Sequence, residues 1–184
     1  MSRIVLITGA SKGIGKSISL AMSQKNNKLY LVSRNKQKLN QIKKLIYSKY
    51  KNNNVKIING DVSNKNLPSK IYKICKKTFG QPEILINNSG GPPSGKFQDF
   101  NYGDWEKSIK SNLLSVINFT NIFSKNMIKR KWGRILTISS LVAKEPSPNM
   151  VLSATTRSGV SAFNKSISFE LAKHKITVNT ILPG

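Results

Sequence analysis

The stretch that most constrains the fold is the amino-terminal one, where a short apolar run meets a cluster of glycines. Residues 3–8 (RIVLIT) are rich in β-branched side chains and predict a short buried strand. The sequence GASKGIG follows at residues 9–15, and a helical pattern opens at Lys16. A strand, a glycine turn and a helix place backbone N–H groups and a helix N-terminus where they can bind a pyrophosphate. The sequence therefore predicts a nucleotide-binding turn.

Each glycine of this turn has an expected role. Gly9 permits the tight turn, Gly13 lets the backbone approach a ligand, and Gly15 lets the helix pack closely on the strand. Their G-x3-G-x-G spacing differs from the G-x-G-x-x-G of the usual dinucleotide fingerprint. Taken alone, the stretch therefore also fits an ordinary loop between a strand and a helix.

Six apolar runs predict the strands of one parallel sheet, at residues 3–8, 28–33, 55–59, 83–87, 134–138 and 176–181. Helical patterns separate them, at residues 16–22, 36–49, 64–79, 105–131 and 153–173. The alternation predicts an α/β fold: a doubly wound, Rossmann-type parallel sheet between two layers of helices. No linker or composition shift divides residues 1–184, so a single dinucleotide-binding domain is expected.

Within two of these helices the sequence makes finer predictions. Leu39, Ile42, Leu45 and Ile46 recur at helical spacing and are expected to face the core. The fourth pattern, residues 105–131, reads as one long helix that Gly133 ends.

Composition excludes several classes of site and location. The single cysteine cannot form an internal disulfide, and the single histidine argues against a histidine-based metal site, so no metal is expected. No run is long and apolar enough to span a bilayer, and the first strand starts too early for a signal peptide. These features predict a cytoplasmic protein.

The charge balance is strongly basic, with 31 Lys and Arg against 7 Asp and Glu, a formal net charge of +24. Such a balance is compatible with nucleic-acid binding. However, the lysines are scattered over all the helical patterns and loops and are not interleaved with aromatic residues. We therefore interpret the charge as a compositional bias that attracts phosphorylated ligands, with no specific nucleic acid and no membrane as partner.

Two basic residues bear on cofactor choice. An NAD-specific site usually has a carboxylate after the second strand, where it binds the ribose hydroxyls. This chain has Arg34 there and no acid. Arg34 can hold a 2′-phosphate through its planar fork, and Lys12 adds a positive charge nearby. NADP(H) is therefore predicted over NAD(H), although Arg34 also fits an ordinary solvated arginine at a helix start.

The stretch Thr8–Gly15 resembles the cofactor loop of the short-chain dehydrogenase/reductase family, and the resemblance extends over nearly the whole chain. Asp61-Val62 is similar to the family's pair at the adenine, and Asn87–Gly90 to its Asn-Asn-Ala-Gly motif with serine for alanine. Pro183-Gly184 is similar to the motif beside the nicotinamide. The resemblance implies these cofactor-binding residues: Gly9, Ser11, Lys12, Gly13, Ile14, Gly15, Arg34, Asp61, Val62, Asn88, Gly90, Pro183 and Gly184.

The resemblance also implies the catalytic positions. Asn112 and Ser140 fall at the family's catalytic asparagine and serine. The family's catalytic tyrosine and lysine should lie thirteen and seventeen positions after the serine. At those positions this chain has Ser153 and Arg157. In this respect the chain resembles a subgroup, similar to 3-oxoacyl-[acyl-carrier-protein] reductases, in which the tyrosine is missing.

This departure changes the expected chemistry. A serine hydroxyl is a far weaker acid than a tyrosine, and an arginine stays protonated. Ser153 and Arg157, which share a helix face, could still polarise a carbonyl and hold an alkoxide. The proton would then come from water, relayed near Asn112. The same replacements equally suit a protein that binds the cofactor without turnover, as a sensor or a partner subunit.

The resemblance leaves three further expectations. Family members continue past the Pro-Gly motif with a substrate-covering segment and a seventh strand, so the chain is expected to be truncated at its C-terminus and to lack that strand. The substrate is expected to be a small carbonyl or alcohol compound, with a 3-oxoacyl thioester, and hence fatty acid biosynthesis, as the leading candidate. Related proteins commonly pair through the last two helices, so a homodimer or homotetramer is the expected assembly.

Overall fold

All six strands of the sheet run parallel, and each is an apolar run that ends at a polar residue or a loop. In the computed structural model, which describes residues 2–184, they are β1 (Ile4–Ile7), β2 (Lys28–Ser33), β3 (Val55–Asn59), β4 (Ile84–Asn87), β5 (Gly133–Ile138) and β6 (Ile176–Ile181). The strand order is β3-β2-β1-β4-β5-β6. The predicted doubly wound sheet is therefore confirmed, and the direction of winding reverses between β1 and β4.

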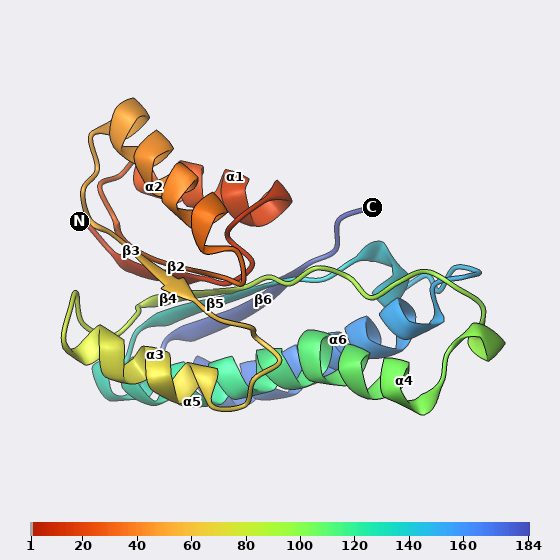
Figure 1. The fold of residues 1–184 in the computed structure, drawn as a ribbon. Helices are drawn as coiled ribbons and strands as arrows, with labels where there is room; N and C mark the ends of the chain where they lie inside the picture. Colours follow the sequence, from red (N-terminus) through yellow and green to blue (C-terminus); the bar gives the residue numbers. More distant parts are fainter. Residues whose placement is uncertain (1) are drawn as a thin grey trace.

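The helices lie in two layers, one on each face of the sheet (Figure 1). They are α1 (Gly13–Ser23), α2 (Lys36–Tyr50), α3 (Leu67–Lys76), α4 (Tyr102–Ile109), α5 (Ser115–Arg130) and α6 (Val151–Ala172). One layer consists of α1 and α2, and the other contains α3, α5 and α6, with α4 extending from its end. Because the crossovers between parallel strands are right-handed, the helices change face once, where the strand order reverses between β1 and β4.

A separate apolar core lies on each face of the sheet. Beneath α3 and α5, the core includes Phe119, Phe123 and Met127, all at most 1% exposed. The core on the other face of the sheet includes Leu39 and Ile46 of α2. The other two positions of the predicted α2 stripe, Ile42 and Leu45, behave differently: Ile42 is buried, but Leu45 is 39% exposed, so its inward placement was wrong. Three residues per two turns are enough to cover the sheet here, which leaves Leu45 at the rim.

The helical stretch predicted for residues 105–131 is confirmed over nearly its whole length, and it contains one wide turn. A wide π turn (Lys110–Leu114) separates α4 from α5, with the Ser115 N–H bonded to the Lys110 carbonyl. The hydroxyl of Ser111 also accepts a bond from the Asn112 amide and donates to the Lys107 carbonyl at 2.8 Å. The wide turn lies within the helical stretch, at the point where side-chain groups compete locally with the helical ladder.

Gly133 does not end this helix, contrary to the prediction. The helix ends at Arg130, and Lys131 takes the left-handed conformation, with φ of 52°. Gly133 is instead the first residue of β5, where a Cβ would meet the Met127 sulfur at 2.5 Å. Its missing side chain therefore serves close packing of strand and helix rather than helix termination.

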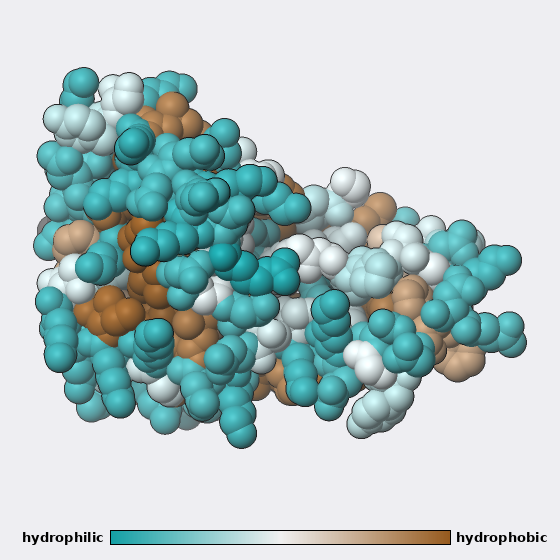
Figure 2. Space-filling view, viewed as in Figure 1, coloured by the Kyte–Doolittle hydropathy of each residue, from teal (hydrophilic) through white to brown (hydrophobic). Residues whose placement is uncertain are grey.

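On the face seen in Figure 2, hydrophilic residues predominate over both helical layers, and apolar residues show mainly between the two layers and toward the right of the view. No helix within residues 2–184 combines the length and the apolar character that crossing a membrane requires.

Candidate active site

The glycine turn between β1 and α1 has the backbone geometry that its sequence predicts. Gly9 and Gly13 have positive φ angles, of 58° and 50°, which other residues rarely adopt. A Cβ on Gly13 would meet nothing within 4 Å, so the backbone there is open to a ligand. A Cβ on Gly15 would lie 2.2 Å from the Gly9 carbonyl oxygen. Gly15 is thus required for close packing, but against the turn itself rather than the strand.

Thr8 and Asn88 hold this turn against the neighbouring strand. The N–H of Asn88 donates to the Thr8 hydroxyl, and that hydroxyl donates to the Asn88 carbonyl, both at 2.8 Å. The Asn88 side-chain amide donates to the carbonyls of Thr8 and Gly9, at 3.3 and 3.2 Å. These bonds join β1 to the loop after β4 at the point where the strand order reverses. Asn88, predicted to bind cofactor, therefore fixes the shape of the turn.

The start of α1 can accept an anion. Its N-cap, Lys12, makes no side-chain capping bond, and the first turn contains no acidic residue. The N–H groups of that turn are therefore available, and the helix dipole favours negative charge there. A groove beside the turn is lined by Ser11, Lys12, Gly13, Lys16 and Lys38 among others. This donor set fits a phosphorylated nucleotide.

On the β2–β3 side, Arg34 and Asp61 face each other after their strands. Arg34 Nη1 lies 3.7 Å from Asp61 Oδ2, and the Arg34 side chain is 79% exposed. Partial burial raises the pKa of the Asp61 carboxyl, but hydrogen bonds from the N–H and hydroxyl of Ser63 lower it. The positive charges of Arg34 and Lys107 act in the same direction, so the pKa of Asp61 is below its ordinary value.

On the β4–β5 side, Asn112 turns inward from the π turn. Asn112 is 1% exposed, and its side-chain oxygen accepts a 3.1 Å bond from the Ser89 hydroxyl. Its amide nitrogen donates to the Ser111 hydroxyl at 2.9 Å and to the Ser108 carbonyl at 3.4 Å. The contribution of Ser89 was missed in the sequence, although its place between Asn88 and Gly90 in a predicted loop at a strand end was a usable signal.

Arg157 is buried at the ends of β4 and β5. It is 5% exposed, and its guanidinium donates to the Ile138 carbonyl at 2.7 Å and to the Ser89 carbonyl at 3.5 Å. Its Nε has no hydrogen-bond partner. Burial lowers the pKa of Arg157. Ser153 lies one turn earlier on α6 and is also buried, so the two residues share the buried face of that helix.

Ser140 and Pro183 are neighbours at the end of the sheet. Ser140 is half-buried where the chain leaves β5, and the following N–H, of Leu141, donates to the Pro183 carbonyl at 2.9 Å. The remaining predicted cofactor residues lie at the same end of the sheet, after β1, β3, β4 and β6. Ile14, Gly90 and Gly184 are exposed, and Val62 is half-buried.

Comparison with known proteins identifies relatives along the whole described chain. Residues 3–184 match the model of the short chain dehydrogenase family. Over 182 residues, the chain is 35% identical to the 3-oxoacyl-[acyl-carrier-protein] reductase FabG of Buchnera aphidicola subsp. Baizongia pistaciae, which covers 99% of this chain and 73% of that protein.

Solved structures of similar proteins share the fold. YwfH, an NADPH dependent reductase involved in bacilysin biosynthesis, superposes with a TM-score of 0.95 at 30% identity, over 100% of this chain and 72% of that one. L-Sorbose reductase from Gluconobacter frateurii, solved with NADPH and L-sorbose, gives a TM-score of 0.94 at 23% identity, over 100% and 69% of the two chains.

Proposed function

The chain belongs to the short-chain dehydrogenase family, and from that premise we propose that it transfers hydride between NADP(H) and a small carbonyl or hydroxyl compound. The observation that carries the proposal is the switch point between β1 and β4. There an open glycine turn, an uncapped helix start and the side chains of Ser89 and Asn112 meet at one end of the sheet. Ligands of open α/β sheets bind at such a point.

The basic residues after β2 and at the start of α1 support NADP(H) over NAD(H). Arg34 follows β2 directly and is largely exposed, so its guanidinium is free to bind a 2′-phosphate in place of its long contact with Asp61. Lys12 is exposed at the start of α1. The NADPH dependence of YwfH, which is 30% identical, agrees with this assignment. When bound, the nicotinamide ring would supply or accept the hydride.

We assign the reacting end to Asn112, Ser140, Ser153 and Arg157. The half-buried Ser140 hydroxyl can donate to a carbonyl oxygen, and the fixed charge of Arg157 can stabilise negative charge that develops there. Neither Ser153 nor Arg157 can release a proton as a tyrosine does, so the proton comes from water near Asn112. The relationship to a 3-oxoacyl-[acyl-carrier-protein] reductase makes a 3-oxoacyl thioester the leading substrate candidate.

A second function, cofactor binding without turnover, is favoured by one observation. The guanidinium of Arg157 donates its hydrogen bonds to backbone carbonyls, and Ser153 is only 5% exposed. Both side chains therefore contact the protein interior. A sensor or a partner subunit needs only the glycine turn and the segment after β2 that contains Arg34.

Binding and turnover measurements distinguish these functions. We expect calorimetry to detect NADPH binding, and absorbance at the NADPH band to fall when a 3-oxoacyl thioester or a simple ketone is added. Ser140→Ala should keep cofactor binding and lose turnover. Binding without turnover by the parent protein would favour the second function, and the absence of binding would overturn both.

A further inference from the structure

The guanidinium of Arg157 is a buried positive charge that no acid compensates. The ion pairs formed within residues 2–184 join other residues, and none includes Arg157. Its hydrogen-bond partners are the carbonyls of Ile138 and Ser89, and its Nε has none. Carbonyl dipoles solvate a cation only in part, and buried charges are usually paired. The site therefore has a net positive potential that an arginine cannot relieve by losing its proton.

The topology places this charge on a definite half of a bound dinucleotide. The pyrophosphate is expected at the start of α1, which follows β1, and the adenosine half lies toward β2. Asp61 and Arg34 occupy that side. The other half must then extend over β4 and β5, whose ends carry the two carbonyls that Arg157 binds. The nicotinamide half consequently lies on the side of the buried guanidinium.

We propose that Arg157 makes this site bind the reduced nicotinamide cofactor more tightly than the oxidised one. This inference rests on the proposed function and extends it to the redox state of the cofactor. The oxidised nicotinamide ring carries a positive charge and the reduced ring is neutral, so a fixed cation nearby repels only the oxidised form. Two unit charges about 10 Å apart, at an effective dielectric constant of about 20, change a binding constant by roughly tenfold.

The consequence for function is a preference for loading NADPH and releasing NADP⁺. NADPH and NADP⁺ share the same phosphates and riboses and differ only in the nicotinamide ring. The charge of Arg157 can therefore distinguish the two forms only through the ring. A fragment without the ring, 2′-phospho-ADP-ribose, is therefore a matched ligand on which Arg157 should have little effect.

The test is a calorimetric comparison of NADPH, NADP⁺ and 2′-phospho-ADP-ribose with the full chain, with no turnover required. The parent protein should bind NADPH roughly tenfold more tightly than NADP⁺. Arg157→Met, which keeps the length of the side chain and removes its charge, should bring this ratio close to one. Arg157→Lys should retain the preference, and all three proteins should bind the ring-free fragment alike.

The possible outcomes distinguish this inference from the proposed function on which it rests. Equal affinities of the parent for NADPH and NADP⁺ would overturn the inference and leave the proposed function standing, as would a ratio unchanged in folded Arg157→Met. If circular dichroism shows that Arg157→Met does not fold, Arg157→Gln, which also removes the charge, takes its place in the comparison, and an unchanged ratio in it overturns the inference. Failure of all three ligands to bind the parent would overturn both.

Discussion

The hydroxyl of Ser89 donates a 3.1 Å hydrogen bond to the side-chain oxygen of Asn112, and so joins the end of β4 to the π turn. Both ends of the Asn112 amide are thereby bonded within the protein, and its orientation is fixed before a ligand arrives. The Ser89 carbonyl also accepts a bond from Arg157. One residue that the sequence did not single out therefore connects two of the predicted catalytic positions.

We expect Ser89→Ala to lower the free energy of unfolding by about 1–3 kcal/mol, because the buried oxygen of Asn112 loses its partner. Urea denaturation measures this loss. Ser94→Ala is the matched control, since Ser94 is exposed in the loop that follows and its removal should cost less than about 0.5 kcal/mol. Equal losses in the two variants would contradict the role given to Ser89.

Gly15→Ala should abolish NADPH binding. The new Cβ would lie 2.2 Å from the Gly9 carbonyl oxygen and 2.7 Å from the Asn88 amide nitrogen, so the turn must open to admit it. Calorimetry on folded protein measures the loss. Gly91→Ala is the control, because a Cβ there would meet nothing within 4 Å. Retention of full affinity by Gly15→Ala would show that the turn does not hold the cofactor.

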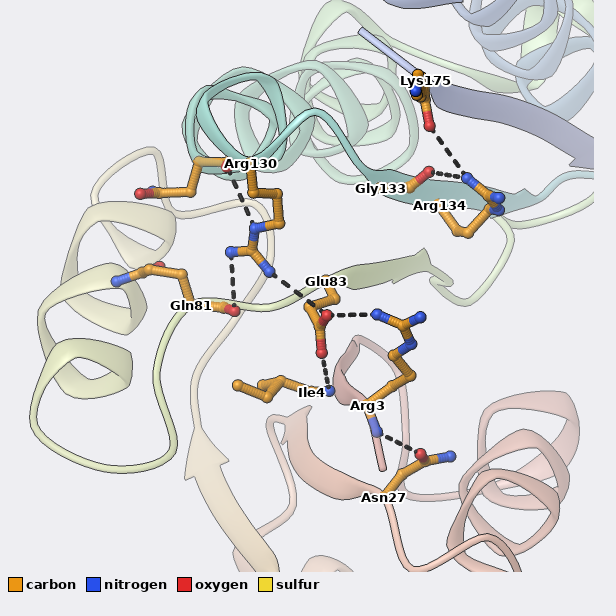
Figure 3. Close-up of polar contacts among 10 residues, drawn as sticks. Arg3, Ile4, Asn27, Gln81, Glu83, Arg130, Gly133, Arg134 and Lys175 are labelled. Carbon is orange, nitrogen blue, oxygen red and sulfur yellow. Dashed lines mark hydrogen bonds and ion pairs between the residues drawn. The ribbon is translucent and has the colours of Figure 1, made fainter. Parts of the chain in front are cut away.

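Glu83 joins the start of β1 to the end of α5, at the end of the sheet opposite the candidate active site (Figure 3). Its carboxylate accepts bonds from Arg3 at 2.8 Å and from the Ile4 N–H at 3.0 Å, and lies 4.0 Å from Arg130. We expect Glu83→Gln to cost about 1–3 kcal/mol of unfolding free energy, because two guanidinium groups lose their anion.

The control for Glu83 is the exposed pair of Glu106 with Lys110, one helical turn apart. Glu106→Gln should change the unfolding free energy by less than about 0.5 kcal/mol, because solvent screens exposed pairs. Thermal or urea denaturation at neutral pH compares the two variants. A cost for Glu83→Gln no larger than that for Glu106→Gln would rule out the proposed junction.

The lowered pKa of Asp61 predicts a pH dependence of stability. A carboxyl with a pKa lower in the folded than in the unfolded state stabilises the fold above its ordinary pKa of 3.8, and this contribution is lost as the pH falls through the folded value. Urea denaturation between neutral pH and about pH 3 should show this loss in the parent. Ser63→Ala removes the hydroxyl bond and keeps the N–H bond, so it should reduce this loss in part, whereas an unchanged pH profile in Asp61→Asn would exclude Asp61 as its source.

Arg34→Ala should weaken NADPH binding by roughly tenfold, the usual contribution of charge-assisted hydrogen bonds to a phosphate. Affinity for NADH, which lacks the 2′-phosphate, should hardly change. Lys49→Ala, at the far end of α2, removes a comparable charge away from the site and should leave both affinities unaltered. An equal fall in NADPH affinity in the two variants would show that Arg34 acts only through the overall positive charge of the protein and not through the 2′-phosphate.

The strands, the glycine turn and the end of the sheet at which the polar residues collect could all be predicted from the residues in order. Fully buried parallel strands are short apolar runs, and the positive φ angles of Gly9 and Gly13 are local needs that only glycine meets readily. Signals of this kind lie within a few neighbouring residues, so the predicted ranges for β2, β3 and β6 agree with the structure residue for residue.

Which of those polar residues contact one another became evident from the folded chain. The bond between Ser89 and Asn112 joins residues 23 positions apart, and the exposure of Leu45 depends on how α2 lies on the sheet. The same holds for Arg157, whose carbonyl partners lie 19 and 68 positions away in the chain. Periodicity within one helix identifies a buried face, but it does not identify the partners of that face, because these are set by the order of the strands in the sheet.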